Sequence, residues 1–320
     1  MGIGSVPSTP ILILISKTLP NVPRNAYDGG IQRINFEAGT IMTDLTLIKA
    51  DELTKPATVL IKKISDAVGG IFKPYQIVRV AKAETEADRI HANSQIEITD
   101  IHRRAMHRFL EEEAQKQINI ESITKHALPL LEEKSTPQDI ADDWITNFFD
   151  KCRIVSESEM QQLWAKILAG EANAPGSFSR RTVNLLSDLE GRDAELFTTL
   201  GGFAWMIRDL NPLVFRLENE IYNRHGINFD SLSQLESLGL IRYAGFAGFM
   251  EAELPKKLTV SYYGRLIELT FPREDNNELM TGQVILTRAG RELAAVCGSK
   301  PIDGFFDFIY ELWKGRSFIP

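Results

Sequence analysis

The sequence predicts a mainly α protein with a long N-terminal helix, a helical core domain and a C-terminal winged-helix-like α+β domain. Residues 75–117 contain no Pro or Gly, which predicts an uninterrupted helix. Bulky apolar side chains then recur at helical spacing up to His225, whereas alternating apolar side chains in 258–271 predict strands. We expect an extension at 1–41 and an amphipathic segment with the long helix at 42–134. A helical core at 135–225, a winged-helix-like domain at 226–298 and an aromatic docking segment at 299–320 are expected to follow.

The composition narrows the class of protein. The 320 residues carry a net charge of -7, which argues against a surface built for nucleic acid. Two cysteines, Cys152 and Cys297, lie far apart without companion ligands, so neither a disulfide framework nor a thiolate zinc site is predicted. We therefore expect a reducing, cytoplasmic location and no cofactor.

Residues 1–41 are rich in Pro and Gly and are expected to form a poorly ordered extension. The longest aliphatic run, Ile11–Ile15, is far shorter than the ~20 residues of a bilayer span. No Lys or Arg precedes this run and no small-residue cleavage site follows it. Neither a membrane-spanning helix nor a signal peptide is predicted.

Residues 53–72 form a predicted amphipathic, basic helix with Pro56 near its first turn. Two interpretations stay open. The helix can pack its apolar face on the rest of the protein, which we favour because Gly69, Gly70 and Pro74 would let it fold back along the long helix. Alternatively it contacts a partner or the inner membrane, as a peripheral protein does. The contact residues would be Lys62, Lys63, Ile64, Val68 and Phe72.

The long helix predicted at 75–117 would extend ~65 Å at the rise of an α-helix. Its apolar residues form a thin stripe at spacings of three and four, which is typical of a helix that packs along one seam. Ile90, Ile101 and Phe109 lie in this stripe, so we expect a homo-oligomer formed through it. A second helix is predicted at 118–133, with a reversal of the chain near Asn119.

The stretch 142–182 contains the densest helical signals. Trp144, Phe148 and Trp164 occupy helical apolar positions, Ser156 with Glu159 predicts a capping box, and Gly170 predicts a helix end. The core reads LWAKILAGE and is followed by PGSFSRRT. It resembles a bacterial family of unknown function, and the resemblance extends over residues 45–298. The resemblance implies a bacterial source and an accessory or phage-defence role, but no chemistry.

The PGSFSRRT turn is a candidate anion-binding site. Ser177, Ser179, Arg180 and Arg181 stand at a predicted helix start, where backbone N–H groups can bind a phosphate. The segment lacks the glycine spacing and the lysine of a phosphate-binding loop. A structural turn is favoured, in which the serines cap helices and Glu171 pairs with an arginine.

The C-terminal half predicts a different architecture. An apolar helix is expected to start at Asp193 and to include Ile207. After Gly226 the order helix, hairpin and Thr287-capped helix resembles a winged helix, with residues 273–282 as the wing. The expected recognition helix at 230–240 contains no Lys or Arg, so protein contact is favoured over DNA.

Candidate catalytic and metal-binding residues are scarce. The spacing of the five histidines matches no metal site, and His102 and His107 are five residues apart on the predicted helix. Neighbouring Asp142 and Asp143 are interpreted as helix N-terminal charges. The aromatic residues of 301–320 are expected to dock on the protein itself, with a partner subunit as the alternative.

We therefore expect a non-enzymatic assembly or regulatory protein that acts through protein–protein contacts. One alternative is a membrane-perturbing effector that uses residues 53–72. A second alternative is a winged-helix DNA-binding regulator, for which the only support is fold analogy.

Overall fold

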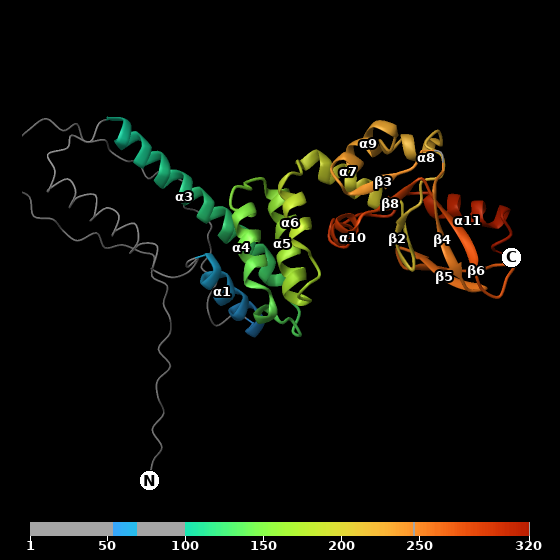
Figure 1. The fold of residues 1–320 in the computed structure, drawn as a ribbon, viewed down its shortest axis with the longest axis horizontal. Helices are drawn as coiled ribbons and strands as arrows, with labels where there is room; N and C mark the ends of the chain where they lie inside the picture. Colours follow the sequence, from blue (N-terminus) through green and yellow to red (C-terminus); the bar gives the residue numbers. More distant parts are fainter. Residues whose placement is uncertain (1–53, 69–99, 246, 320) are drawn as a thin grey trace, which may run out of the picture. The chain divides into compact units, whose positions relative to one another are not determined.

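The computed structural model describes residues 54–68, 100–245 and 247–319 (Figure 1). The predicted extension at 1–41, and residues 75–99 of the predicted long helix, lie outside the described residues. The described residues from Pro56 onwards belong to one compact unit. This unit combines helices with antiparallel sheets, so the prediction of a mainly α protein is wrong.

The first part of the unit is helical. Short 3-10 turns at Leu128–Leu130 and Pro137–Asp139 connect its helices. Helix α3 packs on α5, and α4 packs on α6. The helices are α1 (Lys55–Val68), α3 (Asp100–Ala127), α4 (Asp142–Cys152), α5 (Ser158–Asn173) and α6 (Arg180–Ser187).

Helix α3 continues to Ala127, so the predicted reversal near Asn119 is wrong. Asn119 is buried, and its Nδ2 donates to the carbonyl oxygen of Arg153 at 2.9 Å. Its Oδ1 accepts from Gln161 Nε2 at 3.3 Å. The low helix propensity of asparagine is therefore offset by contacts with distant residues.

Aromatic side chains form the centre of the helical part. The Phe148 ring lies 5.1 Å from those of Trp144 and Trp164, stacked on the first and edge-on to the second. The predicted burial of Trp164 is confirmed, because the residue has no exposed surface. Edge-to-face packing of this kind adds to the free energy gained by burial.

Two predicted boundaries of α5 are wrong. The helix starts at Ser158 with Glu157 as its N-cap, so Ser156 and Glu159 form no capping box. It also continues through Gly170 to Asn173. A Cβ atom at Gly170 would lie 2.6 Å from Cε2 of Phe178, so this glycine makes room for an aromatic ring.

The predicted helix from Asp193 to Ile207 is also wrong in its second half. Helix α7 (Gly191–Gly201) ends at a glycine pair, and the chain continues as strand β1 (Ala204–Ile207). In β1, Trp205 and Ile207 are buried and Met206 between them is exposed. This alternation has the period of a strand, but it is too short to stand out against the preceding helical pattern.

The remaining residues form three antiparallel sheets, with strand orders β2-β1-β5-β6, β3-β8 and β4-β7. The strands are β2 (Asp209–Pro212), β3 (Ile241–Tyr243), β4 (Phe249–Leu254), β5 (Lys257–Tyr262), β6 (Arg265–Thr270), β7 (Asn277–Gly282) and β8 (Val284–Leu286). The helices are α8 (Glu220–Asn223), α9 (Phe229–Ser237), α10 (Arg288–Ala294) and α11 (Phe305–Gly315). Thr287 caps α10, as predicted.

The winged-helix prediction is wrong in its pairing of strands. Residues 277–282 of the expected wing form β7, which pairs with β4. The tight hairpin is instead β5–β6, with a turn at Tyr263 and Gly264. The sequence pattern identified strands here, but it contained no information about which strands pair.

The aromatic C-terminal segment docks on its own chain. Phe305, Ile309 and Trp313 of α11 are buried, and the Trp313 ring lies 4.9 Å from the ring of Trp205 in β1. Tyr262 donates a hydrogen bond to Gly202 O and accepts one from the Ile302 amide, both at 2.7 Å. Aromatic packing and these hydrogen bonds fix α11 against the four-stranded sheet.

Candidate functional site

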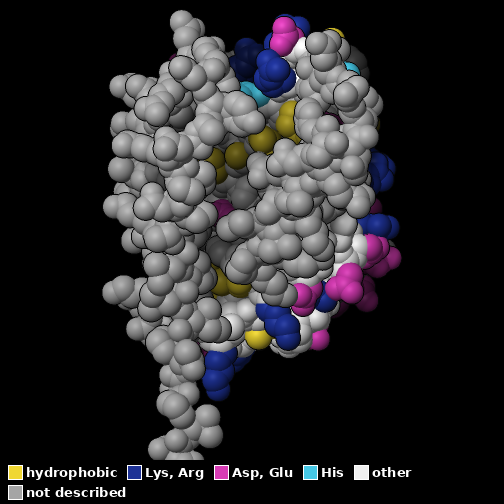
Figure 2. Space-filling model, turned by 90° about the vertical axis from the view of Figure 1, so that its left-hand side faces the viewer, with side chains coloured by type: hydrophobic (Ala, Val, Ile, Leu, Met, Phe, Trp, Pro, Cys, Tyr) yellow, Lys and Arg dark blue, Asp and Glu magenta, His cyan; other side chains and the backbone are white. Residues whose placement is uncertain are grey.

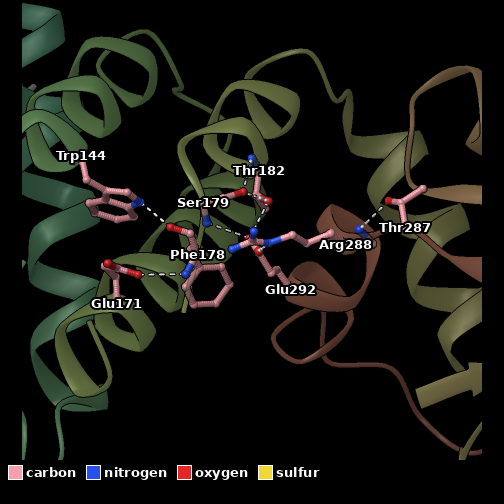
Figure 3. Close-up of polar contacts among 9 residues, drawn as sticks. Trp144, Glu171, Phe178, Ser179, Thr182, Thr287, Arg288 and Glu292 are labelled. Atoms are coloured by element: carbon pink, nitrogen blue, oxygen red, sulfur yellow. Dashed lines mark hydrogen bonds and ion pairs between the residues drawn. The ribbon is translucent and has the colours of Figure 1, made fainter. Parts of the chain in front are cut away.

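The turn between α5 and α6 is built around a buried carboxylate. Glu171 is 3% exposed, and its Oε1 accepts from the Gly176 amide at 2.7 Å. Its Oε2 accepts from the Phe178 amide at 2.9 Å (Figure 3). Gly176 has a φ of +92°, a left-handed conformation that favours glycine. The carboxylate thus satisfies backbone N–H groups that a bound anion would otherwise use.

Phe178 holds the turn against the helices. Its ring packs on Gly170, and its carbonyl oxygen accepts from Trp144 Nε1 at 2.7 Å (Figure 3). The indole therefore links α4 to the turn while its ring remains in the aromatic core. A tryptophan buried with its N–H paired is worth more than its buried area alone.

A second carboxylate lies at the N-terminus of α6. Ser179 is the N-cap, as predicted. Glu292 of α10 accepts from the Ser179 amide at 2.8 Å and from Thr182 Oγ1 at 2.6 Å (Figure 3). Arg288 Nε donates to the other oxygen of Glu292 at 2.8 Å. A negative charge at a helix N-terminus is favourable, so this contact joins α6 and α10.

The two carboxylates have opposite pKa shifts. Burial raises the pKa of Glu171, and the backbone hydrogen bonds only partly offset this effect. Burial also acts to raise the pKa of Glu292, but hydrogen bonds from Thr182, Ser179 and Arg288 outweigh it and lower the pKa. The ionised form is therefore favoured more strongly at Glu292 than at Glu171.

The predicted anion-binding residues have partners within the protein. Ser177 donates to the carbonyl oxygen of Ala174, and Arg180 pairs with Asp143 at 2.9 Å instead of with Glu171. Arg181 is exposed. The cavity of 440 Å³ beside the turn is lined by Asp139, Asp143 and Glu171 as well as Arg180. An external anion here stays a prediction, one that the surrounding carboxylates disfavour.

The predicted membrane or partner contact lies mostly against the protein itself. Ile64 is fully buried, Val68 is partly buried, and Lys63 pairs with Asp142 at 2.6 Å. Lys62 is exposed, and Phe72 lies outside the described residues. Four of these five residues are described, and the apolar ones among them turn towards the core.

The predicted oligomer seam has the opposite character. Ile101 is 64% exposed and Phe109 is 57% exposed on α3, whereas Ile90 lies outside the described residues. Figure 2 views the molecule from the side on which α1 and α3 lie, and it shows a band of hydrophobic side chains with Lys and Arg at its upper end. The seam thus leaves large apolar side chains at the surface.

Sequence reasoning missed a second cavity, of 690 Å³, which is lined by Arg216 and Arg316 among others. These two arginines are a hundred positions apart and belong to no local motif. A lone arginine beside an aromatic residue, as in Phe215–Arg216, is too common a pattern to indicate a site.

Metal and membrane features are absent from the part of the chain that the structure describes. Within 54–68, 100–245 and 247–319, no three His, Cys, Asp or Glu residues lie close enough together to hold a metal ion. Within the same residues, no helix combines the length and apolarity needed to cross a bilayer. Burial raises the pKa of the Cys152 thiol well above its usual range.

The structure is that of a mixed α and β protein. Its best-defined polar cluster, around Glu171 and Glu292, connects helices of the same chain. The chain belongs to DUF2806, a family of proteins of unknown function, and residues 103–310 match its family model. This match confirms the resemblance to an uncharacterised family, and it assigns no activity. No curated protein and no solved structure matches the chain.

Proposed function

We propose that the protein is a non-enzymatic assembly protein that associates with a second copy of itself through the first half of α3. The exposed apolar side chains of residues 100–113 carry this proposal. Within that half, four large hydrophobic residues are at least 37% exposed: Ile101, Met106, Phe109 and Leu110. Single exposed apolar residues are common, but a group on one helix is typical of a contact surface.

The spacing of these residues supports a continuous stripe. Ile101 and Phe109 are eight positions apart, with Ala105 midway, so all three lie on one face of the helix. Met106 and Leu110 are four positions apart and form a neighbouring row. The two rows together give the width of an apolar face that a second helix covers.

The charges beside the stripe favour a second copy in antiparallel orientation. A basic triad, Arg103, Arg104 and Arg108, precedes an acidic triad at 111–113. Two copies of α3 that cross antiparallel near Phe109 place each basic triad opposite the partner's acidic triad. A two-fold axis produces such a self-complementary interface. The present pairs within the helix, such as Arg108–Glu112 at 3.4 Å, are exposed and can exchange.

The absence of a catalytic role is part of the proposal. Glu171 and Glu292, the carboxylates of the candidate site, are both engaged by protein groups. The alternative of a membrane effector is less well supported, since Leu60 and Ile64 of α1 are buried. DNA binding lacks support because α9 carries no Lys or Arg. A role in phage defence stays a prediction.

Light scattering and sedimentation equilibrium test the proposal. Wild-type protein is expected to exceed the mass of one protomer, whereas Phe109→Asp and Ile101→Asp are expected to reduce it to one. Ile154→Asp is the matched control, because Ile154 is 69% exposed but lies outside α3. A monomeric wild type, or a control that dissociates equally, contradicts the proposal.

A charge exchange tests the antiparallel orientation. One variant carries both exchanges, with the basic triad changed to Glu and the acidic triad changed to Arg. In the antiparallel arrangement this variant keeps unlike charges opposite each other in its own dimer but places like charges opposite each other in a dimer with the wild type, so it is expected to self-associate and not to pair with the wild type. Preferential pairing of the variant with the wild type contradicts the antiparallel arrangement while leaving contact through the apolar stripe to the preceding test.

A further inference from the structure

The cavity of 690 Å³ lies between the end of α11 and the loops that follow β2 and β7. Its size is within the range of small-molecule sites, about 300 to 1,000 Å³. It is separate from the turn between α5 and α6 and from the stripe on α3, because it shares no lining residue with either.

The charge of the cavity is one-sided. Arg216 and Arg316 line it, and no Asp or Glu does. Both arginines are exposed, and neither forms an ion pair with a described residue. The guanidinium of Arg316 lies 5.6 Å from the centre of the Phe215 ring. Two arginines without acidic partners in a recess are suited to an oxyanion, which each can bind in a bidentate manner.

An apolar wall lies beside the arginines. Phe308 and Leu312 of α11 and Met280 of β7 contribute it. The Phe308 ring is held by two aromatic neighbours, stacked on Phe305 at 6.0 Å and edge-on to Tyr222 at 6.1 Å. A ring fixed in this way costs little ordering entropy when a ligand packs against it.

Gly282 and Gln283 shape part of the lining. The backbone N–H of Gln283 donates to the carbonyl oxygen of Val214 at 2.6 Å. Gly282 has a φ of +107°, and a Cβ atom there would collide with Val214. The Gln283 side chain donates through Nε2 to Gly245 O, while its buried Oε1 has no partner among the described residues. Because Oε1 has no accessible surface, a ligand in the cavity cannot reach it, and Gln283 contributes only to the shape of the cavity.

We propose that this cavity binds a small organic oxyanion. Arg216 and Arg316 hold the anionic group, and the wall of Phe308 and Leu312 packs against an apolar body. The combination requires both parts of the ligand, since the arginines alone would bind any anion and the wall alone any apolar group.

Four probes separate these contributions in titrations of the full chain followed by ligand-observed NMR. Phenyl phosphate and benzoate carry both features, inorganic phosphate carries the anion alone, and phenol carries the ring alone. We expect phenyl phosphate or benzoate to bind about tenfold more tightly than both single-feature probes, a difference of about 1.4 kcal/mol. Which of the two binds better distinguishes a phosphate ligand from a carboxylate ligand.

Two variants locate the binding. Arg216→Gln and Arg316→Gln are each expected to weaken the better probe by about tenfold. Arg224→Gln is the matched control, because Arg224 is exposed and does not line the cavity. An unchanged thermal midpoint in all three variants shows that the fold is intact. No binding of either organic anion at ~10 mM, equal binding of inorganic phosphate, or equal weakening by the control overturns the proposal.

Discussion

Helix α1 and the first half of α3 both carry apolar residues at helical spacing, but the surroundings of these residues differ. In α1, Leu60 and Ile64 have no exposed surface. In α3, Ile101 and Phe109 are more than half exposed. An amphipathic pattern thus predicts that a helix has an apolar face, but it does not determine whether the same chain covers that face.

The largest expected effect comes from a substitution on the buried face of α1. Ile64→Ala removes a fully buried side chain and is expected to lower the free energy of unfolding by about 2–5 kcal/mol, because it leaves a cavity. Phe109→Ala is the matched change on the uncovered face and is expected to alter it by less than ~0.5 kcal/mol. Urea denaturation of monomeric protein measures both. Equal losses would mean that the protomer itself covers the stripe of α3.

A smaller effect locates the point at which α3 enters the core. Asn119→Ala removes the donor to the carbonyl oxygen of Arg153 and one of the two acceptors of Gln161 Nε2, which keeps Val155 O, at an expected cost of about 1–3 kcal/mol. Gln115→Ala, one turn earlier and exposed, removes a donor to Asn119 Oδ1 but leaves these contacts with distant residues in place, so it is expected to cost less than ~0.5 kcal/mol. Similar urea midpoints for the two variants would show that the boundary lies elsewhere on the helix.

The smallest effect concerns the lysines of α1. Lys63→Glu breaks the pair with Asp142, which is 87% exposed, so we expect a loss of about 0.5–1 kcal/mol that high salt reduces. Lys62→Glu is the exposed control and is expected to have almost no effect. If the wild type instead binds anionic liposomes and both charge reversals abolish this binding, α1 contacts lipid. The contrast between a covered α1 and an uncovered α3 would then be wrong.

Local signals in the sequence were sufficient for several elements. Ser179 and Thr287 cap α6 and α10 as predicted, because the hydroxyl and the amide that it caps are three residues apart. Burial of Trp164 followed from helical spacing alone. Such features depend on neighbours within one turn of helix, which a single sequence contains in full.

Features that depend on distant residues were missed. Gly170 was interpreted as a helix end, but its role is to accept the ring of Phe178. Asn119 was interpreted as a break, but Arg153 and Gln161 satisfy its side chain within the helix. In each case tertiary contacts override local propensity.

The candidate site shows the same division. The turn and its cap were predicted from residues 175–181, whereas Arg180 pairs with Asp143 instead of the expected Glu171. The partner at the N-terminus of α6, Glu292, lies 110 positions beyond Thr182. No spacing rule connects two such positions, so only the folded chain could reveal the contact.

The bond between Thr182 and Glu292 also has a consequence for synthesis on the ribosome. The 110 residues that separate them take roughly 5 to 20 seconds to translate. During that interval the Ser179 amide lacks the carboxylate that it donates to in the finished protein. Helix α6 therefore gains its full N-terminal stabilisation only after α10 has been synthesised, so the order of translation is part of how this junction forms.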